Sequence, residues 1–256
     1  MKAVILAGGR GTRLAEETSV RPKPMVEIGG LPMLVHIMDG YARHGIADFV
    51  VACGYKGDVI KSWFRDFSLA SGDLEIDLAS GRVDAVAANA RDWRVSLVDT
   101  GLDTFTGGRL KRLAPRLCDG TFLATYGDGL ADVDIARLVQ FHRAHGRLAT
   151  VTAVHPPARF GALDLDGDRV TDFAEKVQAR EGWINGGFFV FEPAVLDRIG
   201  GDGSSLEHDL LATLTAEGEL MAYRHEGFWH PVDTLRDKLA LQALWESGQA
   251  PWAQGR

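Results

Sequence analysis

A glycine-rich segment that carries two arginines follows the first apolar run of the chain. Residues 3–6 read Ala-Val-Ile-Leu, and residues 7–14 continue as Ala-Gly-Gly-Arg-Gly-Thr-Arg-Leu. Glycines let the backbone turn sharply and bring N–H groups close to an anion, because no Cβ stands in the way. Arg10 and Arg13 add guanidinium groups that can pair with phosphate oxygens in a bidentate manner. The segment therefore predicts a phosphate-binding loop at the end of a first strand.

The spacing of these glycines excludes two common nucleotide-binding motifs. A dinucleotide fingerprint requires Gly-x-Gly-x-x-Gly, and a Walker A loop requires Gly-x-x-x-x-Gly-Lys-Ser/Thr. Residues 8–13, which read Gly-Gly-Arg-Gly-Thr-Arg, match neither pattern. A plain tight turn between a strand and a helix is the alternative, but it would leave the two arginines unexplained.

Lys23 lies between two prolines, in Arg21-Pro22-Lys23-Pro24-Met25. Each proline fixes its own φ and pushes the preceding residue toward extended conformations, so this segment is expected to be stiff. A lysine held in this way, close in sequence to Arg13, suits the charge of a polyphosphate. A proline-bounded loop with a solvated lysine is the alternative.

Two aspartates are candidate ligands for a metal ion. Asp128 lies in Tyr126-Gly127-Asp128-Gly129, directly after an apolar strand, and the carboxyl edge of a parallel sheet is where α/β proteins bind ligands. Mg²⁺ takes one or two carboxylates together with substrate phosphates, so Asp128 and Asp233 are the candidate magnesium ligands. The alternatives are a turn residue for Asp128 and the N-terminal cap of a following helix for Asp233.

Groups that suit a sugar phosphate occur near the ends of later strands. Glu175-Lys176 and Asn185-Gly186 supply a carboxylate, an ammonium group and an amide, with an exposed ion pair and a turn as the simpler alternatives. His142 and His145 share a helical face without a third ligand, so both are expected to be solvated helix residues. The sequence contains no Gly-x-Ser-x-Gly elbow and no setting for a catalytic cysteine.

The elements that must position these residues alternate between strands and helices in the first half of the chain, which is typical of a parallel sheet with crossover helices. Strands are predicted at 2–6, 48–54, 121–126, 149–155, 170–174, 187–191 and 219–223. Helices are predicted at 31–44 with Pro32 in the first turn, 57–67, 132–145 and 234–246. The fold class is therefore α/β, with a Rossmann-like, mostly parallel central sheet and flanking helices.

The stretch from about 68 to 120 is less regular and is interpreted as an insertion. Short strands are expected at 74–78 and 93–98, followed by a basic segment at 107–112. Insertions of this kind often carry specificity or oligomer contacts. A length of 256 residues suits one large domain, so 1–256 is predicted to be a single domain.

Composition excludes several classes of protein. A formal net charge of −7 argues against a general nucleic-acid-binding protein. No apolar run approaches the about 20 residues of a membrane helix, and the first residues enter a strand without a signal-peptide pattern, so a cytoplasmic protein without membrane contact is expected. Cys53 and Cys118 are too few for a disulfide scaffold and are expected to be buried and unreactive.

Taken together, these motifs resemble the sugar-1-phosphate nucleotidyltransferase family over nearly the whole chain. The resemblance rests on the segments above and on longer blocks at residues 25–30, 54–56, 97–101, 106–112, 159–164, 185–190 and 233–238. Val177 departs from the family pattern, which usually has proline after Glu-Lys. The resemblance implies the nucleotide-diphospho-sugar transferase fold, with a sugar-binding second half.

Within the family, the blocks are most similar to members that transfer a cytidylyl group from CTP to α-D-glucose 1-phosphate, giving CDP-glucose and pyrophosphate. This similarity implies CTP and glucose 1-phosphate as substrates, Mg²⁺ as the cofactor, a homo-oligomer, and a role in nucleotide-sugar synthesis for surface polysaccharide such as O-antigen. A sugar phosphate is already ionised near neutral pH and can attack the α-phosphorus directly. Positioning and charge neutralisation would then supply most of the catalysis.

The resemblance also implies a role for each candidate residue. The backbone of residues 6–10 would receive base and ribose, and residues 11–13 would clamp the triphosphate, with Arg13 stabilising the leaving pyrophosphate. Lys23 would bridge the α-phosphate and the sugar phosphate, while Asp128 and Asp233 would hold Mg²⁺. The implied catalytic residues are Arg13, Lys23 and Asp128. The implied substrate-binding residues are Leu6, Ala7, Gly8, Gly9, Arg10, Gly11, Thr12, Arg13, Lys23, Thr104, Arg109, Tyr126, Gly127, Glu175, Lys176, Asn185 and Gly186.

Three of these roles concern particular parts of the substrates. Glu175 and Asn185 would bind the glucose hydroxyl groups, and Lys176 would bind the sugar phosphate. Thr104 and Arg109 belong to a segment that resembles the family's nucleotide-contacting insertion, which reaches the nucleotide in an oligomer.

Two other functions remain open on the sequence. One is a thymidylyl- or other nucleotidyltransferase that acts on a different hexose 1-phosphate, because the glycine loop and Lys23 would serve all such enzymes. The other is an inactive nucleotide-sugar sensor. The joint presence of Arg13, Lys23, Asp128 and Asp233 disfavours the sensor, because a sensor could lose the metal pair without losing binding.

Overall fold

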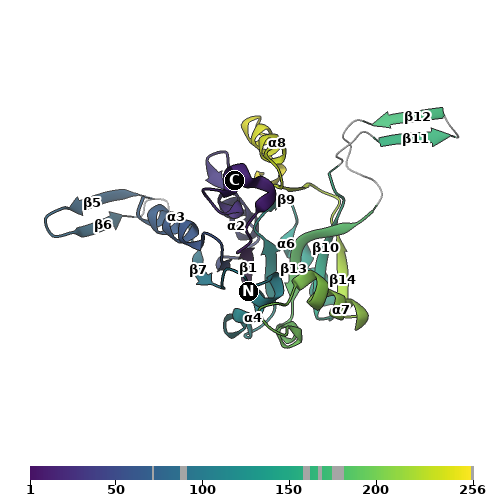
Figure 1. Cartoon of the computed structure of the whole chain (residues 1–256), viewed down its shortest axis with the longest axis horizontal. Coiled ribbons are helices and arrows are strands. Elements are labelled where there is room, and N and C mark those ends of the chain that lie inside the picture. Colours follow the sequence, from purple (N-terminus) through teal and green to yellow (C-terminus); the bar gives the residue numbers. More distant parts are fainter. Residues whose placement is uncertain (71, 87–90, 158–161, 167–168, 175–181, 255–256) are drawn as a thin grey trace.

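A seven-stranded sheet forms the centre of the computed structural model, which describes residues 1–70, 72–86, 91–157, 162–166, 169–174 and 182–254 (Figure 1). The strand order is β14-β10-β13-β8-β1-β4-β7. The strands are β1 (Lys2–Ala7), β4 (Asp48–Cys53), β7 (Arg94–Asp99), β8 (Phe122–Tyr126), β10 (Ala149–Val154), β13 (Ile184–Phe191) and β14 (Leu220–Arg224). Only β13 among them runs antiparallel to its neighbours, β8 and β10. The predicted, mostly parallel central sheet is therefore confirmed.

Helices cover both faces of this sheet. The longer ones are α2 (Met33–Ala42), α3 (Gly57–Ala70), α6 (Ile135–His145) and α8 (Leu235–Glu246). The shorter helical segments are η1 (Thr12–Leu14), α1 (Ala15–Thr18), η2 (Lys23–Met25), α4 (Thr106–Arg112), α5 (Ala114–Leu117), η3 (Pro193–Arg198), the π-helical turn η4 (Leu206–Leu211), α7 (Ala212–Ala216) and η5 (Pro251–Ala253).

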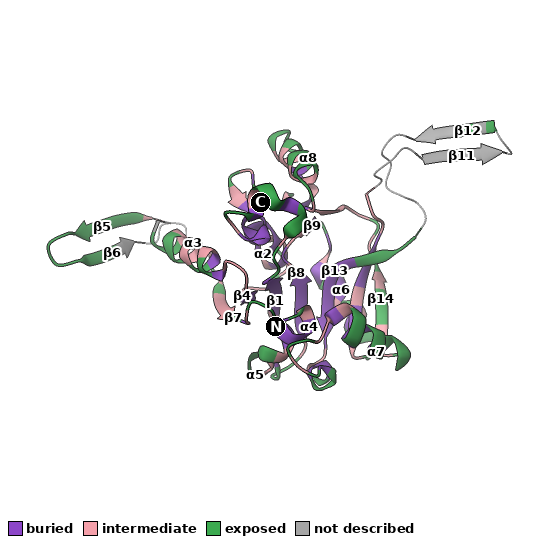
Figure 2. Ribbon diagram, viewed as in Figure 1, coloured by how far each residue is buried: buried purple, intermediate pink, exposed green. Residues whose placement is uncertain are grey.

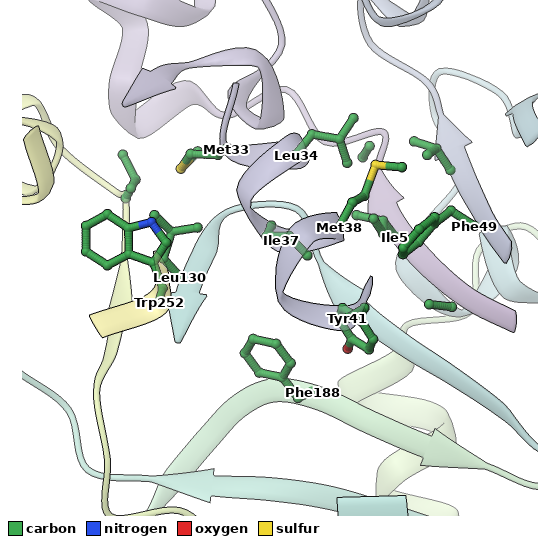
Figure 3. Close-up of a cluster of buried hydrophobic side chains, with 14 of the residues drawn as sticks. Ile5, Met33, Leu34, Ile37, Met38, Tyr41, Phe49, Leu130, Phe188 and Trp252 are labelled. Atoms are coloured by element: carbon green, nitrogen blue, oxygen red, sulfur yellow. The ribbon is translucent and has the colours of Figure 1, made fainter. Parts of the chain in front are cut away.

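Alternate residues of the central strands fill two separate cores, because successive strand side chains point to opposite faces. In β1, Ile5 packs with α2 residues such as Met38, and Phe49 of β4 joins them (Figure 3). Val4 of the same strand faces the second core, which includes Leu110 of α4. Full burial of side chains of this size stabilises the fold by about 1.5–3 kcal/mol each. Figure 2 shows the central strands buried between these layers.

Four two-stranded ribbons complete the structure. β2 (Glu27–Ile28) pairs with β3 (Leu31–Pro32), and β9 (Gly129–Ala131) pairs with β15 (Trp229–Pro231). β5 (Asp73–Asp77) with β6 (Arg82–Val86), and β11 (Ala162–Asp166) with β12 (Arg169–Ala174), form two arms that extend away from the sheet on opposite sides (Figure 1). Within the predicted insertion, the first arm therefore projects outward, whereas β7 joins the main sheet beside β4.

Some element boundaries differ from the sequence prediction. Leu31 and Pro32 form strand β3, so the helix predicted at 31–44 begins only at Met33. The helix predicted at 132–145 begins at Ile135, because the Asp134 carboxylate caps its first turn by accepting from Arg137 N at 2.9 Å. The basic segment at 107–112, for which no helix was predicted, lies within α4.

Two predictions about single side chains were wrong. Cys53 is buried as expected, but Cys118 is exposed because it lies in the turn that follows α5. His142 is buried rather than solvated, because Thr150 Oγ1 at 2.8 Å and Glu192 Oε1 at 3.1 Å satisfy its two ring nitrogens. In the part of the chain that the structure describes, none of the helices combines the length and apolar character needed to cross a membrane.

Candidate active site

A cavity of about 460 Å³ opens at the carboxyl ends of β1 and β8. These strands are parallel neighbours, with Leu6 beside Tyr126, and Gly127 N donates to Leu6 O at 3.1 Å. The two segments that follow the strands therefore meet at one edge of the sheet. The predicted site residues that line the cavity are Leu6, Ala7, Gly8, Gly9, Gly11, Thr12, Arg13, Lys23, Thr104, Arg109, Tyr126, Gly127 and Asp128.

The glycine-rich loop leaves β1 and turns into the short helix η1. Gly11 has φ 61°, in the left-handed region that favours glycine, and a Cβ there would lie 2.9 Å from Thr18 Cγ2. Its carbonyl accepts from Leu14 N at 3.0 Å and lies 3.1 Å from Thr18 Oγ1. The turn that the sequence predicted is thus closed by local hydrogen bonds and directs Thr12 and Arg13 toward the cavity.

Lys23 lies at the centre of a charged cluster. Its Nζ donates to Asp128 Oδ2 at 2.8 Å and to Asp233 Oδ1 at 2.7 Å, and only 9% of its side chain is exposed. The other Asp233 oxygen accepts from Arg13 Nη1 at 2.8 Å. Four residues from three separate parts of the sequence therefore converge where the ends of β1 and β8 meet. The lysine is buried and paired, rather than solvated.

Asp233 is not the N-terminal cap of α8. That cap is Thr234, whose Oγ1 accepts from Asp237 N at 3.3 Å while Asp237 Oδ2 accepts from Thr234 N at 2.8 Å. This capping box fixes the start of the helix. The Asp233 carboxylate points instead to Lys23 and Arg13.

The two aspartates fit a small, hard divalent cation. Their carboxylates approach each other closely enough for one ammonium group to contact both. The described residues include no cluster of three or more His, Cys, Asp or Glu side chains that could hold a metal by themselves. Two carboxylates leave most of an octahedral shell to phosphate oxygens and water, as Mg²⁺ prefers.

Arg109 lies under the glycine loop of its own chain. Its guanidinium is buried, and Gly8 comes so close that a Cβ there would lie 2.1 Å from Arg109 Cζ. Burial, together with the nearby charge of Arg112, lowers the pKa of Arg109, and Asp99 partly opposes this shift. The guanidinium donates to Cys53 O at 3.3 Å, Thr100 Oγ1 at 2.7 Å, Gly101 O at 2.8 Å, Gly8 O at 3.1 Å and Leu102 O at 3.3 Å.

Three other predicted residues that the structure describes, Arg10, Asn185 and Gly186, do not line the cavity. Arg10 pairs with Asp103 at 3.0 Å and has a largely exposed side chain. Asn185 Nδ2 donates to Tyr126 Oη at 3.3 Å, and Gly186 O accepts from Trp229 Nε1 at 2.7 Å. Glu175 and Lys176 lie outside the described residues.

Sequence reasoning missed three polar residues that line the cavity. They are Thr106 at the start of α4, Ser205 before η4, and Glu207 within η4. The sequence around Glu207, Ser204-Ser205-Leu206-Glu207, offers only the Ser-x-x-Glu pattern of a helix start as a signal.

Comparison with known proteins decides the family. The model of the nucleotidyl transferase family matches residues 2–246. The chain belongs to this family. This nucleotidyl transferase is 54% identical over 253 residues to the glucose-1-phosphate cytidylyltransferase of Salmonella typhi, covering 98% of each chain. It is 41% identical to a probable glucose-1-phosphate cytidylyltransferase of Bacillus subtilis, covering 98% of this chain and 99% of that protein. The predicted family and the assignment as an enzyme are confirmed.

Solved structures confirm the fold of this nucleotidyl transferase. HddC from Yersinia pseudotuberculosis complexed with GMP-PN has a TM-score of 0.71 at 23% identity, covering 95% of this chain and 99% of that one. A UDP-glucose pyrophosphorylase complexed with UDP-glucose has a TM-score of 0.68 at 13% identity, covering 96% and 98%. Members of the family generally use a divalent metal ion.

Proposed function

We propose that this enzyme transfers the cytidylyl group of CTP to α-D-glucose 1-phosphate and releases pyrophosphate. The observation that carries the proposal is the cluster of Lys23, Arg13, Asp128 and Asp233 at the mouth of the glycine loop. These groups suit a reaction between two phosphates, and the cavity beside them has room for a nucleotide. Similarity to the Salmonella typhi enzyme supports cytosine as the base and glucose as the sugar.

The order of residues along the sheet edge supports a proposed place for each substrate. Arg109 and the glycine loop lie at the ends of β4 and β1, Asp128 follows β8, and Asn185 is the second residue of β13 beyond it. With the phosphates at Lys23, the base and ribose lie on the glycine-loop side. The sugar then lies on the Asn185 side.

The chain's own residues then perform the transfer by positioning and charge neutralisation. An oxygen of the sugar phosphate attacks the α-phosphorus in line, and the bond to the pyrophosphate oxygen breaks. Lys23 holds the attacking phosphate beside the α-phosphate, and Arg13 stabilises the negative charge that collects on the leaving pyrophosphate. Since the sugar phosphate is already ionised near neutral pH, no side chain needs to remove a proton.

Asp128 and Asp233 are proposed to hold Mg²⁺. When bound, the ion would neutralise phosphate charge at the α-phosphorus. The ammonium group of Lys23, which contacts both carboxylates, must then turn toward the substrate phosphates. The two aspartates therefore bind the Lys23 ammonium group when the metal is absent and would bind the metal when it is present.

The rest of the organisation is proposed from the same resemblance. The whole chain, 1–256, would form one nucleotidyltransferase domain in which residues 68–120 are an insertion and the second half binds the sugar. The enzyme would act in the cytoplasm as a homo-oligomer, with Thr104 and Arg109 near a nucleotide shared with a neighbouring subunit. It would supply CDP-glucose for surface polysaccharide.

An assay of pyrophosphate release with CTP, UTP, dTTP and GTP, each with glucose 1-phosphate, tests the function. Cytosine carries an exocyclic amine that can donate a hydrogen bond to a backbone carbonyl. Uracil and thymine carry a carbonyl oxygen at the same position, so two acceptors would face each other. Such a mismatch costs about 1–3 kcal/mol, so we expect CTP to exceed UTP and dTTP at least about tenfold in kcat/KM.

The same assay separates the alternatives. Equal or better efficiency with dTTP would replace the cytidylyl assignment by a thymidylyltransferase. Nucleotide binding without pyrophosphate release for any nucleotide and hexose 1-phosphate would indicate a sensor.

A further inference from the structure

Glu207 is a partly buried carboxylate in the cavity wall that the roles above do not use. It lies in the π-helical turn η4, and such turns are rare and frequent at functional sites. The segment before it is tied to α4, where Phe105 N donates to Asp202 O at 2.8 Å and Gly108 N to Ser204 O at 3.0 Å. The carboxylate is therefore held at a fixed place in the wall.

Three hydroxyl groups donate to the Glu207 carboxylate. Tyr126 Oη donates to Oε1 at 2.5 Å, while Thr106 Oγ1 at 2.9 Å and Ser205 Oγ at 2.7 Å donate to Oε2. Burial alone would raise the pKa of Glu207, but these hydrogen bonds outweigh it and the pKa is lowered. The group is thus an ionised acceptor at neutral pH.

The direction of two of these hydrogen bonds is fixed by their surroundings. Ser205 Oγ accepts from the backbone N–H groups of Glu207 and His208, both at 3.1 Å, so its own proton is directed to Glu207. Thr106 Oγ1 accepts from Leu206 N at 2.8 Å and likewise directs its proton to the carboxylate. A glutamine at this position would have to place its amide oxygen at Oε2, to accept from both hydroxyl groups, and its NH2 group toward Tyr126 Oη, so the hydrogen bond to Tyr126 would be reversed.

The same carboxylate decides how Tyr126 can bind a ligand. The hydroxyl of Tyr126 donates to Glu207 Oε1 at 2.5 Å, so the proton of the phenol is directed to this carboxylate. The ring is held by an edge-to-face contact with Phe189, 5.6 Å between centroids. Its oxygen accepts from Asn185 Nδ2 at 3.3 Å. Toward the cavity, Tyr126 Oη can therefore accept a hydrogen bond but has no proton left to donate.

Tyr126 stands on the side of the cavity that the proposed function gives to the sugar. It is the last residue of β8, two residues before Asp128, and Asn185 of the neighbouring strand β13 contacts it. A sugar hydroxyl at this position would have to donate.

We propose that Glu207 is a positioning residue for sugar recognition, which accepts the hydrogen bond of the Tyr126 hydroxyl so that Tyr126 Oη in turn accepts a hydrogen bond from one hydroxyl of the hexose phosphate. This inference rests on the proposed function only for the identity of the ligand as a hexose 1-phosphate. It gives Tyr126, which the resemblance implies only as a substrate-binding residue, a specific partner on the sugar and a reason for its orientation.

Glu207→Gln and Tyr126→Phe test the inference by steady-state kinetics with both substrates varied. Because one hydrogen bond to the sugar is lost or misdirected, we expect KM for the sugar phosphate to rise about tenfold in each variant, with KM for the nucleotide unchanged. Glu207→Asp, which keeps an acceptor, should recover part of the loss. Glu192→Gln is the matched control, because Glu192 also accepts from a hydroxyl, Thr121 Oγ1 at 2.8 Å, beyond the far end of β13.

Deoxy sugars identify the hydroxyl. In the wild type, removing the hydroxyl that Tyr126 contacts should lower kcat/KM about tenfold for one of the 2-, 3-, 4- and 6-deoxyhexose 1-phosphates, relative to the full sugar. In Tyr126→Phe and Glu207→Gln, which already lack this contact, the same deoxy sugar should cause little further loss. Additive losses for all four analogues, or a rise in KM for the nucleotide instead of the sugar, would overturn the inference.

The panel is built on whichever hexose 1-phosphate and nucleotide the wild type uses fastest. An error in the proposed base or sugar therefore leaves this test intact. Unfolding temperatures of the variants, measured in parallel, show whether Glu207→Gln is folded, and Tyr126→Phe alone carries the deoxy-sugar test if it is not.

Discussion

Replacing Lys23 by glutamine should make this enzyme less stable without metal and more responsive to Mg²⁺. Lys23 Nζ lies 2.8 Å from Asp128 Oδ2 and 2.7 Å from Asp233 Oδ1. At an effective dielectric constant of about 20, each contact is worth about 6 kcal/mol of gross attraction, most of which offsets desolvation. Breaking a buried pair costs about 3–5 kcal/mol, and the lower end applies because 37% of the Asp128 side chain is exposed.

The response to Mg²⁺ follows from the shared carboxylates. In the wild type the ion must displace the ammonium group, whereas in Lys23→Gln it meets two carboxylates that lack this partner. If a third to a half of the stability lost with the lysine, about 3 kcal/mol, is gained as binding energy for the ion, Mg²⁺ binds roughly five- to tenfold more tightly. Thermal unfolding at increasing Mg²⁺, without nucleotide, measures this through the stabilisation RT ln(1 + [Mg²⁺]/Kd).

The control for this experiment is Lys238→Gln. Lys238 forms a partly buried ion pair with Glu17, outside the cavity lining, so its loss should lower stability without changing the response to Mg²⁺. If Mg²⁺ raises the Tm of Lys23→Gln by no more than it raises that of the wild type, the idea that lysine and metal share the aspartates is refuted. Turnover of Lys23→Gln should also fall by on the order of a hundredfold, because a preorganised charge at the phosphates is lost.

Two further predictions follow from buried side chains. Arg109→Ala leaves several main-chain carbonyls without a donor, so KM for CTP should rise about tenfold and by more than KM for the sugar. Steady-state kinetics check this, with Arg112→Ala as the control because it removes only an exposed pair with Asp202. Equal effects of the two variants would contradict the prediction. Burial, together with His142 and Arg147, lowers the pKa of His145 in the folded protein. As the pH falls, the His145 ring is therefore protonated in the unfolded chain before it is protonated in the folded one, so the stability should decrease below a pH of about 6.5. Urea unfolding at pH 7.5, 6.5 and 5.5 should show a steeper loss in the wild type than in His145→Gln; parallel curves would contradict the assignment.

The parts of the site that sequence predicted are those built from neighbours in the chain. The glycine loop, Lys23 and Asp128 each lie at a strand end or between prolines, where a few adjacent residues determine the conformation. Asp233 was ambiguous, because a carboxylate before a helix also suits a cap. Its contact with Arg13 spans 220 residues, and only the folded sheet brings the two together.

The missed elements are those that depend on distant packing. Gly107 and Gly108 disfavour a helix locally, yet α4 forms because the backbone of residues 202–206 packs against it. Glu207 was missed for the same reason, since its partners Thr106 and Tyr126 lie 101 and 81 residues away. The strand β6 was missed for a different reason: it pairs with the neighbouring strand β5 in an exposed arm, where no buried face imposes a hydrophobic pattern on the sequence.

The contacts of Arg109 have a consequence for how the enzyme can change during evolution. Four of its five acceptors are main-chain carbonyls, which every residue type provides. Substitutions at Cys53 or Leu102 can therefore alter side chains while the acceptors stay in place. Among the acceptors, only the Thr100 hydroxyl belongs to a side chain, so a comparison of related sequences would find covariation of an acceptor with this arginine at position 100 alone. The coupling between α4 and the nucleotide loop would otherwise appear only as a limit on the size of the residues at positions 8 and 54, where a Cβ would meet the guanidinium.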